Sequence, residues 1–369
     1  MSLFGSLYVG ASGLQTGQNA LNTTAHNLSN VDTKGYTRQQ TLLTDKNYNL
    51  LSVNPKAAAN QQTGLGVTYA DVRQVRDSFL DQKYRKESGR SAFYEVSYNT
   101  LGEVETLLGE LDGESFSESM NDLWEAVQEL AKQPASSVTQ GLLIQRASQF
   151  VEQAGNVYSA LSKYQDNLNN QIKGEVDQIN QYADRLFALN NEIIKIETGG
   201  IERANDLRDE RNQILDALGG YGNISYSEDW NGSVNVKYEG HTLVNATQVF
   251  KIGLDQNSDT GFYTPFWQGD AKKIPQENGT FRYDISNCKV FDLTREISTA
   301  CNTDIGSLKG MLVARGDHRA DYTDLQDADA YNETVSSSIL MNVQAEFDNL
   351  VHNIVTKFNE VLELSLIHI

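Results

Sequence analysis

Residues 150–196 read FVEQAGNVYSALSKYQDNLNNQIKGEVDQINQYADRLFALNNEIIKI, and their apolar side chains recur at steps of three and four. That spacing places them on one face of an α-helix. The pattern predicts a single helix from Val138 to Ile196, about 90 Å long. The stripe consists of Phe150, Ala154, Val157, Leu161, Tyr164, Leu168, Ile172, Val176, Ile179, Ala183, Leu186, Asn190, Ile193 and Ile196. Because one helix cannot bury such a stripe alone, it requires partner helices.

Proline is confined to Pro55, Pro134, Pro265 and Pro275, so residues 135–264 contain none. Proline breaks helix interiors, and its absence leaves room for long helices. Apolar residues at helical spacing predict partner helices on both sides of the long stripe. Their ranges are 76–110, 115–133 and 339–362. Together these segments predict one elongated helical bundle.

A shorter helix is predicted after the long one. The run Thr198-Gly199-Gly200 supplies an end for the long helix. Asn205 then fits the N-cap of a helix from Asp206 to Leu218, and Gly219 fits its end.

Beyond residue 219 the apolar period changes to strict alternation, which is typical of strands. Asn231-Gly232 and Glu239-Gly240 stand where hairpin turns belong. Strands are predicted over 224–226, 234–238, 241–244, 249–254, 262–267 and 281–285. The predicted fold class is therefore mainly α with an inserted β domain.

The predicted domain organisation follows from these patterns. Residues 1–45 form an N-terminal axial segment with a coiled-coil-forming helix. Residues 46–219 together with 301–363 form the elongated helical bundle, and residues 220–300 form the inserted β domain.

Composition excludes several classes of protein. The 369 residues include 30 basic and 49 acidic side chains, a net charge of −19. This balance argues against binding to nucleic acid or to an anionic membrane surface, since both select basic faces. No apolar run approaches the roughly 20 residues that span a bilayer. The first residues lack the basic and apolar regions of an ordinary secretory signal.

The sequence predicts no metal site and no cofactor. Cys288 and Cys301 lack neighbouring ligands, and we expect both to be small buried hydrophobes. Residues 316–336 are rich in Asp and Glu but lack the spacing of a calcium loop. We expect this segment to be a solvated acidic surface.

The first residues carry a heptad pattern. Leu7, Leu14, Leu21 and Leu28 recur every seven residues, and the positions four residues before them are Leu3, Gly10, Gly17 and Thr24. Leucine at one core position and small residues at the other predict a coiled-coil seam that admits a close partner helix. The alternative is an ordinary amphipathic helix that packs on its own domain.

The heptad segment runs into residues 27–39, NLSNVDTKGYTRQ. Asn27 and Asn30 can cap a helix end, and Thr33 can close a local side-chain bond. Gly35 supplies a turn, and Tyr36 offers a flat apolar face with a polar tip. Residues 27–38 are called the exit motif below, because they predict where the N-terminal helix ends and the chain leaves it.

The exit motif resembles that of the bacterial flagellar axial proteins, which are the rod, hook and hook-associated proteins. Its general form is Asn-x-x-Asn-x-x-Thr-x-Gly-Tyr, and it covers Asn27 to Tyr36. Arg38 and Gln39 are typical of the hook-associated protein 1 family, the first junction proteins between hook and filament. The segments NDLRDERNQILDAL at 205–218 and GSLKGML at 306–312 are similar to the same family.

The resemblance implies a structural component of the flagellum that forms the hook–filament junction by self-assembly in the axial tube. It implies as partners the hook protein, the second junction protein or filament, and a flagellar export chaperone. It also implies export by the flagellar type III system without a cleaved signal peptide. The expected location is the extracellular flagellum, and the expected role is in motility.

Family members end in a second heptad helix that packs beside the N-terminal one. Here the sequence stops shortly after Leu362, and residues 364–369 match the translation of a widely used sequencing-library adaptor. We expect residues 364–369 to be a non-native tail and the partner helix to be missing. A genuinely shortened protein is the alternative.

Three other functions are alternatives to a hook–filament junction protein. Another axial protein, hook or distal rod, is the nearest alternative. A surface adhesin could use hairpin aromatic residues, which more often belong to a core; they are Trp230, Tyr238, Tyr263 and Trp267. A peptidoglycan-cutting enzyme needs two positioned carboxylates, and among 49 acidic residues some pair always looks suitable. No metal-binding or nucleophile motif is present, so the prediction is a protein that is not an enzyme.

Overall fold

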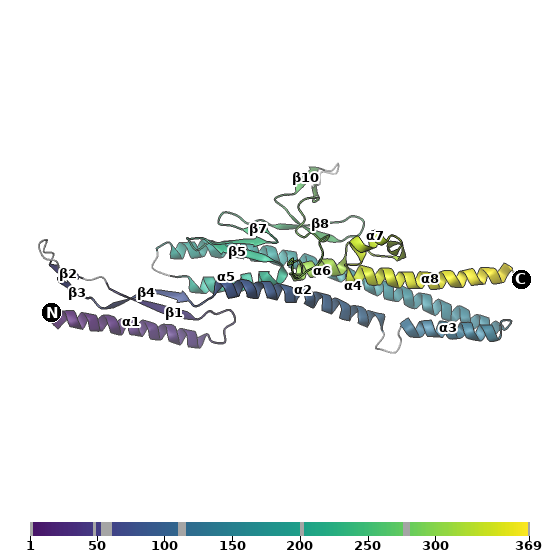
Figure 1. Ribbon diagram of the computed structural model, residues 1–369, viewed down its shortest axis with the longest axis horizontal. Coiled ribbons are helices and arrows are strands. Elements are labelled where there is room, and N and C mark those ends of the chain that lie inside the picture. The colour runs from purple at the N-terminus through teal and green to yellow at the C-terminus, as the bar shows by residue number, and fades with distance from the viewer. Residues whose placement is uncertain are drawn as a thin grey trace.

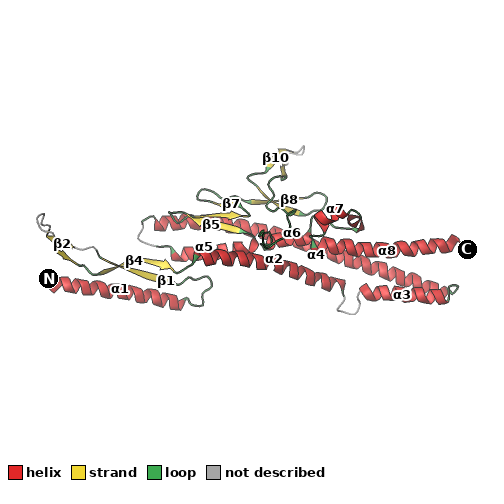
Figure 2. Ribbon diagram, in the orientation of Figure 1, coloured by secondary structure: helices red, strands yellow, loops and turns green. Residues whose placement is uncertain are grey.

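The computed structural model describes residues 3–46, 49–52, 61–109, 116–199, 203–275 and 281–367. The molecule is a rod, with the two ends of the chain at opposite ends of its long axis (Figure 1). Helices run along the rod, and short strands lie on one side of them (Figure 2). The observed class is mainly α with inserted β, as the sequence predicted.

The long predicted helix is present as α4, Ser137–Glu197. Leu161, Ile172, Ile179 and Ile193 of its stripe are fully buried. The C-terminal end of the stripe is less buried than the pattern predicts, since Ile196 is 42% exposed. Tyr164 is only partly buried, and Gln165 occupies the buried position beside it, where its amide donates hydrogen bonds to the carbonyl oxygens of Arg315 and His318.

The partner helices lie close to their predicted ranges. They are α2 (Ser78–Leu108), α3 (Phe116–Lys132) and α8 (Ile339–Ile367). A further short helix, α6 (Ser307–Arg315), is almost completely buried between α2 and α4. The run at 306–312 therefore returns the chain to the helical body.

The helix α5 spans Asn205–Tyr221, and both of its predicted ends are wrong. Asn205 is not the N-cap, because its side-chain amide instead donates to the Val72 carbonyl oxygen at 3.0 Å. Gly219 does not end the helix. A Cβ at Gly219 would lie 3.0 Å from the Arg85 Cβ, so the glycine serves the close crossing of α5 and α2.

The β region lies where alternation placed it. A three-stranded antiparallel sheet contains β5 (Ile224–Glu228), β6 (Val234–Tyr238) and β7 (His241–Val244). Two hairpins follow, β8 (Ile252–Gln256) with β9 (Tyr263–Trp267), and β10 (Lys272–Pro275) with β11 (Phe281–Asp284). The sequence did not predict β10.

Three asparagines of α4 bind this β region. Asn190 exchanges hydrogen bonds with the backbone of Val234, donating at 2.9 Å and accepting at 3.1 Å. Asn180 does the same with Ile252, at 2.9 and 3.0 Å. Asn169 donates to the Gly261 carbonyl oxygen and accepts from the Tyr263 N–H. Each amide thus replaces a neighbouring strand, and the three lie on one face, about three helical turns apart.

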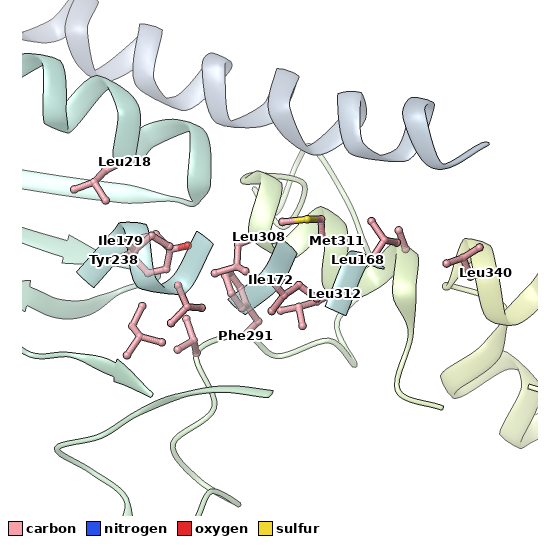
Figure 3. Close-up of a cluster of buried hydrophobic side chains, with 14 of the residues drawn as sticks. Leu168, Ile172, Ile179, Leu218, Tyr238, Phe291, Leu308, Met311, Leu312 and Leu340 are labelled. Carbon is pink, nitrogen blue, oxygen red and sulfur yellow. The ribbon is translucent and has the colours of Figure 1, made fainter. Parts of the chain in front are cut away.

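One buried cluster joins the helices and the strands (Figure 3). Ile172 and Ile179 of α4 lie in it with Tyr238 of β6 and with Leu308 and Leu312 of α6. The division into separate bundle and β domains stays a prediction, because apolar side chains of both parts share this core.

A ribbon that the sequence did not predict lies between the N-terminal helix and α2. It pairs β1 (Gln39–Asp45) with β4 (Val67–Gln74) in antiparallel register. A second pair, β2 (Asn49–Ser52) with β3 (Gln61–Thr63), extends it. Few of the residues of β1 and β4 are strongly apolar, which hid the strands from pattern analysis.

The acidic segment exposes Asp317, Asp321, Asp327 and Asp329 to solvent, as predicted, and its backbone is folded. It contains a 3₁₀ turn (Tyr322–Leu325), the short helix α7 (Ala328–Ala330) and a π-helical turn (Tyr331–Val335). Buried Ala320 and Val335 form a small core with Met341 and Ala345 of α8. Of the two cysteines, Cys288 is buried as expected but Cys301 is exposed, so the expectation for Cys301 was wrong.

Among the described residues, no group of three or more His, Cys, Asp or Glu side chains could hold a metal ion. Within the same residues, no helix is both long and apolar enough to cross a membrane.

We predict that Asn169→Ala lowers the free energy of unfolding by about 2–4 kcal/mol. The change leaves the Tyr263 N–H without its acceptor and also removes one of the acceptors, at 2.6 Å, of the buried Arg315 guanidinium. Asn170→Ala is the control, because the neighbouring Asn170 is exposed. Denaturant unfolding measures both variants, and equal small losses would contradict a structural role for the α4 asparagines.

Candidate functional site

The N-terminal helix α1, Leu3–Ser29, turns its leucines to solvent. Leu7, Leu14, Leu21 and Leu28 are 62%, 78%, 70% and 74% exposed. A side chain added at Gly10 or Gly17 would meet nothing within 4 Å. The Leu3 side chain lies outside the described residues. These four leucines, called the leucine stripe below, form an apolar face that water covers in the isolated chain.

The opposite face of α1 is polar and packs on the β1–β4 ribbon, which lies directly above α1 in Figure 1. Ser12 and Thr16 are buried there, with Thr16 Oγ1 donating to the Ser12 carbonyl oxygen at 2.6 Å. Thr41 Oγ1 of β1 donates to Thr23 Oγ1 at 3.0 Å. An ordinary amphipathic helix would bury its leucines on its own domain, whereas α1 is anchored by its small polar residues.

The exit motif fixes how the chain leaves α1. The Asn27 side chain donates to the Gln39 carbonyl oxygen at 2.9 Å and accepts from the Gln39 N–H at 2.8 Å. The Tyr36 hydroxyl donates to the same Asn27 oxygen at 2.7 Å. Asn27 therefore pairs with the start of β1 as a neighbouring strand would, and holds β1 antiparallel to α1.

The remaining residues of the motif shape the turn. Asn30 donates to the His26 carbonyl oxygen, and Thr33 Oγ1 donates to Asn30 Oδ1. Gly35 has φ of +82°, a conformation that residues with a Cβ rarely adopt. A Cβ at Gly35 would also overlap the Gln213 side chain of α5. The exit motif thus needs glycine at this position for both reasons.

The exit motif meets α5, so two segments far apart in sequence form one joint. Asp209 accepts from the Thr37 N–H at 3.2 Å and from the Gln74 amide of β4 at 2.8 Å. Burial raises the pKa of the Asp209 carboxyl. Burial, and next the negative charges of Asp209 and Asp206, raise the pKa of the Tyr36 phenol. The joint attaches α1 and its ribbon to the rod.

A groove of about 650 Å³ lies between α1 and β1, beside the leucine stripe. Leu28, Val31, Tyr36 and Arg38 belong to its lining. Leu28 and Val31 are each more than 70% exposed, and Arg38 is exposed as well. Leu28 thus belongs both to the predicted seam and to the exit motif and lines this groove, while Leu7 and Leu14 lie farther along α1.

A second exposed apolar row follows α2 on the face opposite its buried Phe93 and Val104. The sequence prediction did not include this row, although steps of four and three residues were readable on either side of a gap of ten residues between Tyr84 and Tyr94. It consists of Leu80, Tyr84, Tyr94, Tyr98 and Leu101. Exposed apolar side chains are thus not confined to α1.

The chain matches the family model of the flagellar hook-associated protein FlgK helical domain over residues 101–366. It belongs to this family. A second model, of flagella basal body rod proteins, matches residues 7–37, which contain the leucine stripe and most of the exit motif. The chain is thus a flagellar hook-associated structural protein, with the helical domain in its rod and a rod-protein segment at α1.

Relatives carry the same description. The chain is 26% identical to a flagellar hook-associated protein 1 from Bacillus subtilis over 366 residues, which cover 98% of this chain and 67% of the relative. It is 29% identical to one from Salmonella typhimurium over 249 residues, or 67% of this chain and 44% of the relative. The chain therefore spans about two thirds of the first relative and less than half of the second.

Among solved structures, the chain is similar to that of the flagellar hook junction protein FlgK from Burkholderia pseudomallei. The TM-score is 0.49 at 17% identity, over 64% of this chain and 38% of that chain.

We predict that Asn27→Ala loosens β1 from α1, because the change removes all three hydrogen bonds to the Asn27 side chain. A loss of about 1–2 kcal/mol corresponds to roughly tenfold faster exchange of the β1 amides. Hydrogen exchange read by NMR measures it. Asn22→Ala, on the exposed side of the same helix, is the matched control. Equal exchange in the two variants would show that Asn27 does not hold the ribbon.

Proposed function

We propose that the chain is a subunit of the hook–filament junction that assembles by burying its leucine stripe in the axial tube. The observation that carries this proposal is the orientation of α1. Its polar face is occupied by the β1–β4 ribbon, while Leu7, Leu14, Leu21 and Leu28 are 62–78% exposed. A solvent-covered apolar row at heptad spacing is the surface that a partner helix buries.

The magnitudes favour assembly over an isolated ordered helix. Complete burial of a leucine contributes roughly 1.5–3 kcal/mol. Each glycine in a helix costs about 1 kcal/mol relative to alanine, and α1 contains Gly5, Gly10, Gly13 and Gly17. The gain from four buried leucines exceeds that cost, so association of subunits orders α1.

The proposed partners follow from this position. Neighbouring copies contribute to the inner tube, in which Leu3 extends the stripe and Gly10 and Gly17 admit a close helix. The hook protein lies on one side of the junction, and the second junction protein or filament lies on the other. The exit motif, from Asn27 to Arg38, joins the tube to the outer body.

We further propose that the chain reaches the flagellum exterior through the flagellar type III system, with a flagellar export chaperone and without cleavage of a signal peptide. The net charge of −19 keeps subunits apart before assembly. It also supports the absence of nucleic-acid and membrane partners.

Alternative functions have weaker support. Hook or distal-rod proteins share the segment that matches residues 7–37, but the helical-domain match over residues 101–366 favours the junction. For an adhesin, the aromatic residues would need to be accessible, yet Tyr238 and Trp267 are buried, while Trp230 stands alone at 98% exposure. We also propose that the protein is not an enzyme, since the family is structural.

The first test is hydrogen exchange on the soluble monomer. Because the leucine stripe is exposed and α1 contains four glycines, we expect the amides of residues 5–35 to exchange far faster than those of α4. Strong protection of residues 5–35 in the monomer would refute the assembly-coupled ordering of α1.

The second test places a charge on the stripe. Leu14→Glu and Leu21→Glu should abolish self-association measured by sedimentation velocity at increasing concentration, because a buried carboxylate opposes seam burial. The fold of the rod should be unchanged. Gln15→Glu adds the same charge on exposed α1 surface beside the stripe and should associate normally. If Leu14→Glu associates as well as Gln15→Glu, the leucine stripe is not the assembly face.

A further inference from the structure

Residues 317–325, in the acidic segment, lie across two helices and bind both. On the α4 side, Gln165 donates to the His318 carbonyl oxygen at 2.8 Å. On the α8 side, the Ala320 N–H donates to Gln344 Oε1 at 3.2 Å, and the Tyr322 N–H donates to Asp348 Oδ2 at 3.0 Å. These residues are called the clasp below.

The His318 ring closes the clasp on itself. Its Nδ1 lies 2.6 Å from Asp317 Oδ1, and its Nε2 lies 3.2 Å from Asp324 Oδ2. An ionised carboxylate only accepts hydrogen bonds, and a neutral imidazole carries a single N–H. With both ring nitrogens facing carboxylate oxygens, both hydrogen bonds form only when the ring carries its second proton. The geometry is therefore that of a charged imidazolium between two aspartates.

Asp324 connects this ring to the backbone of the clasp. Its Oδ2 also accepts from the Asp321 N–H at 2.9 Å, while the Asp321 side chain accepts from the Thr323 N–H at 2.8 Å. This reciprocal cap begins the 3₁₀ turn at Tyr322. If His318 loses its charge, one of the two aspartates loses its N–H donor and both lose the attraction of the cation, so the turn that Asp324 caps loses part of its support.

Other charged groups face the clasp from both helices. Arg319 pairs with Asp166 of α4 through two contacts of 2.9 Å. Tyr158 of α4 donates to the Ala320 carbonyl oxygen, and Asp348 of α8 accepts from the clasp. His352 of α8 stacks on Tyr322 with ring centroids 3.9 Å apart. None of these side chains contacts the His318 ring nitrogens, whose carboxylate partners are Asp317 and Asp324.

The clasp covers the place where α8 begins. Ala320 packs with Met341 and Ala345 of α8 in the small buried core. The Asp317 N–H lies 3.3 Å from the Met341 sulfur, and the Ser338 hydroxyl donates to the Ala314 carbonyl oxygen. The first turns of α8 are thus held on the rod by residues adjoining His318.

We propose that residues 317–325 form a proton-operated clasp, which fixes the start of α8 against α4 while His318 is charged and releases it when His318 is neutral. The proposal gives a role to the acidic segment, which the assembly function leaves unexplained. It does not rest on the proposed function, because it concerns only contacts within one chain.

The direction of the pH dependence follows from the same geometry. The hydrogen bonds and charges of Asp317 and Asp324 raise the pKa of His318 above its ordinary value, against the opposing effect of burial. A group with a raised folded-state pKa stabilises the fold fully below the unfolded-state pKa and loses that contribution as pH rises through the folded-state pKa. The clasp is closed at pH values below the folded-state pKa of His318 and opens at pH values above it.

The test is hydrogen exchange of the Ala320 and Tyr322 amides from about pH 5.5 to about pH 8.5, expressed as protection factors, together with an NMR titration of His318. Protection should fall several-fold as pH rises through the His318 pKa. His318→Gln should give low protection at every pH. His318→Arg keeps a charged donor between Asp317 and Asp324, and should retain protection at high pH.

Two controls separate the clasp from other pH effects. Burial raises the pKa of Glu175 on α4 to about 7, so global stability also falls over this range. That loss of global stability affects all variants alike. Only a fall in protection at Ala320 and Tyr322 that is larger than the global fall reports the opening of the clasp. His352→Gln removes the other nearby imidazole and should keep the pH dependence. If His318→Gln retains the wild-type pH dependence, or if His318 titrates at or below its ordinary pKa, the proposal is overturned.

Discussion

The burial of one face of α4 is the constraint on which the rest of the structure depends. A helix of 61 residues carries an apolar stripe that no single neighbour covers, so α3, α6 and α8 pack along different parts of it, and α5 joins them near its end. The asparagines of α4 solve a second problem. Strands laid against a helix would leave backbone groups unpaired, and Asn169, Asn180 and Asn190 supply the missing partners.

The same arrangement leaves α1 outside the shared core. Its attachment to the rod runs through the β1–β4 ribbon and the joint at Asp209, which are built mainly from hydrogen bonds. Small polar residues of α1 meet the ribbon, so the leucine stripe stays exposed. A hydrogen-bonded attachment holds the orientation of a helix without consuming its apolar face. In this protein the apolar face of α1 remains exposed.

Sequence patterns predicted the helices well because their apolar side chains repeat at steps of three and four over many turns. They also placed most strands of the β region, since Val234 to Tyr238 alternate clearly. They failed where the decisive partner is distant in sequence. Gly219 has the local features of a helix end, yet it allows α2 to cross α5 closely. The leucine stripe of α1 was readable from the sequence. No local sequence feature indicated that the face carrying Thr16 would be the buried one.

By itself the sequence determined the rod, the heptad of α1, the exit motif and the family that they indicate, because periodicity and turn residues act over a few neighbouring positions. Only the tertiary structure decided which face of α1 is anchored, that the exit motif meets α5 at Asp209, and that His318 stands between Asp317 and Asp324. These outcomes depend on hydrogen-bond geometry and close packing. Such geometry is fixed only when the burial of α4 brings distant segments together, and residue order alone does not express it.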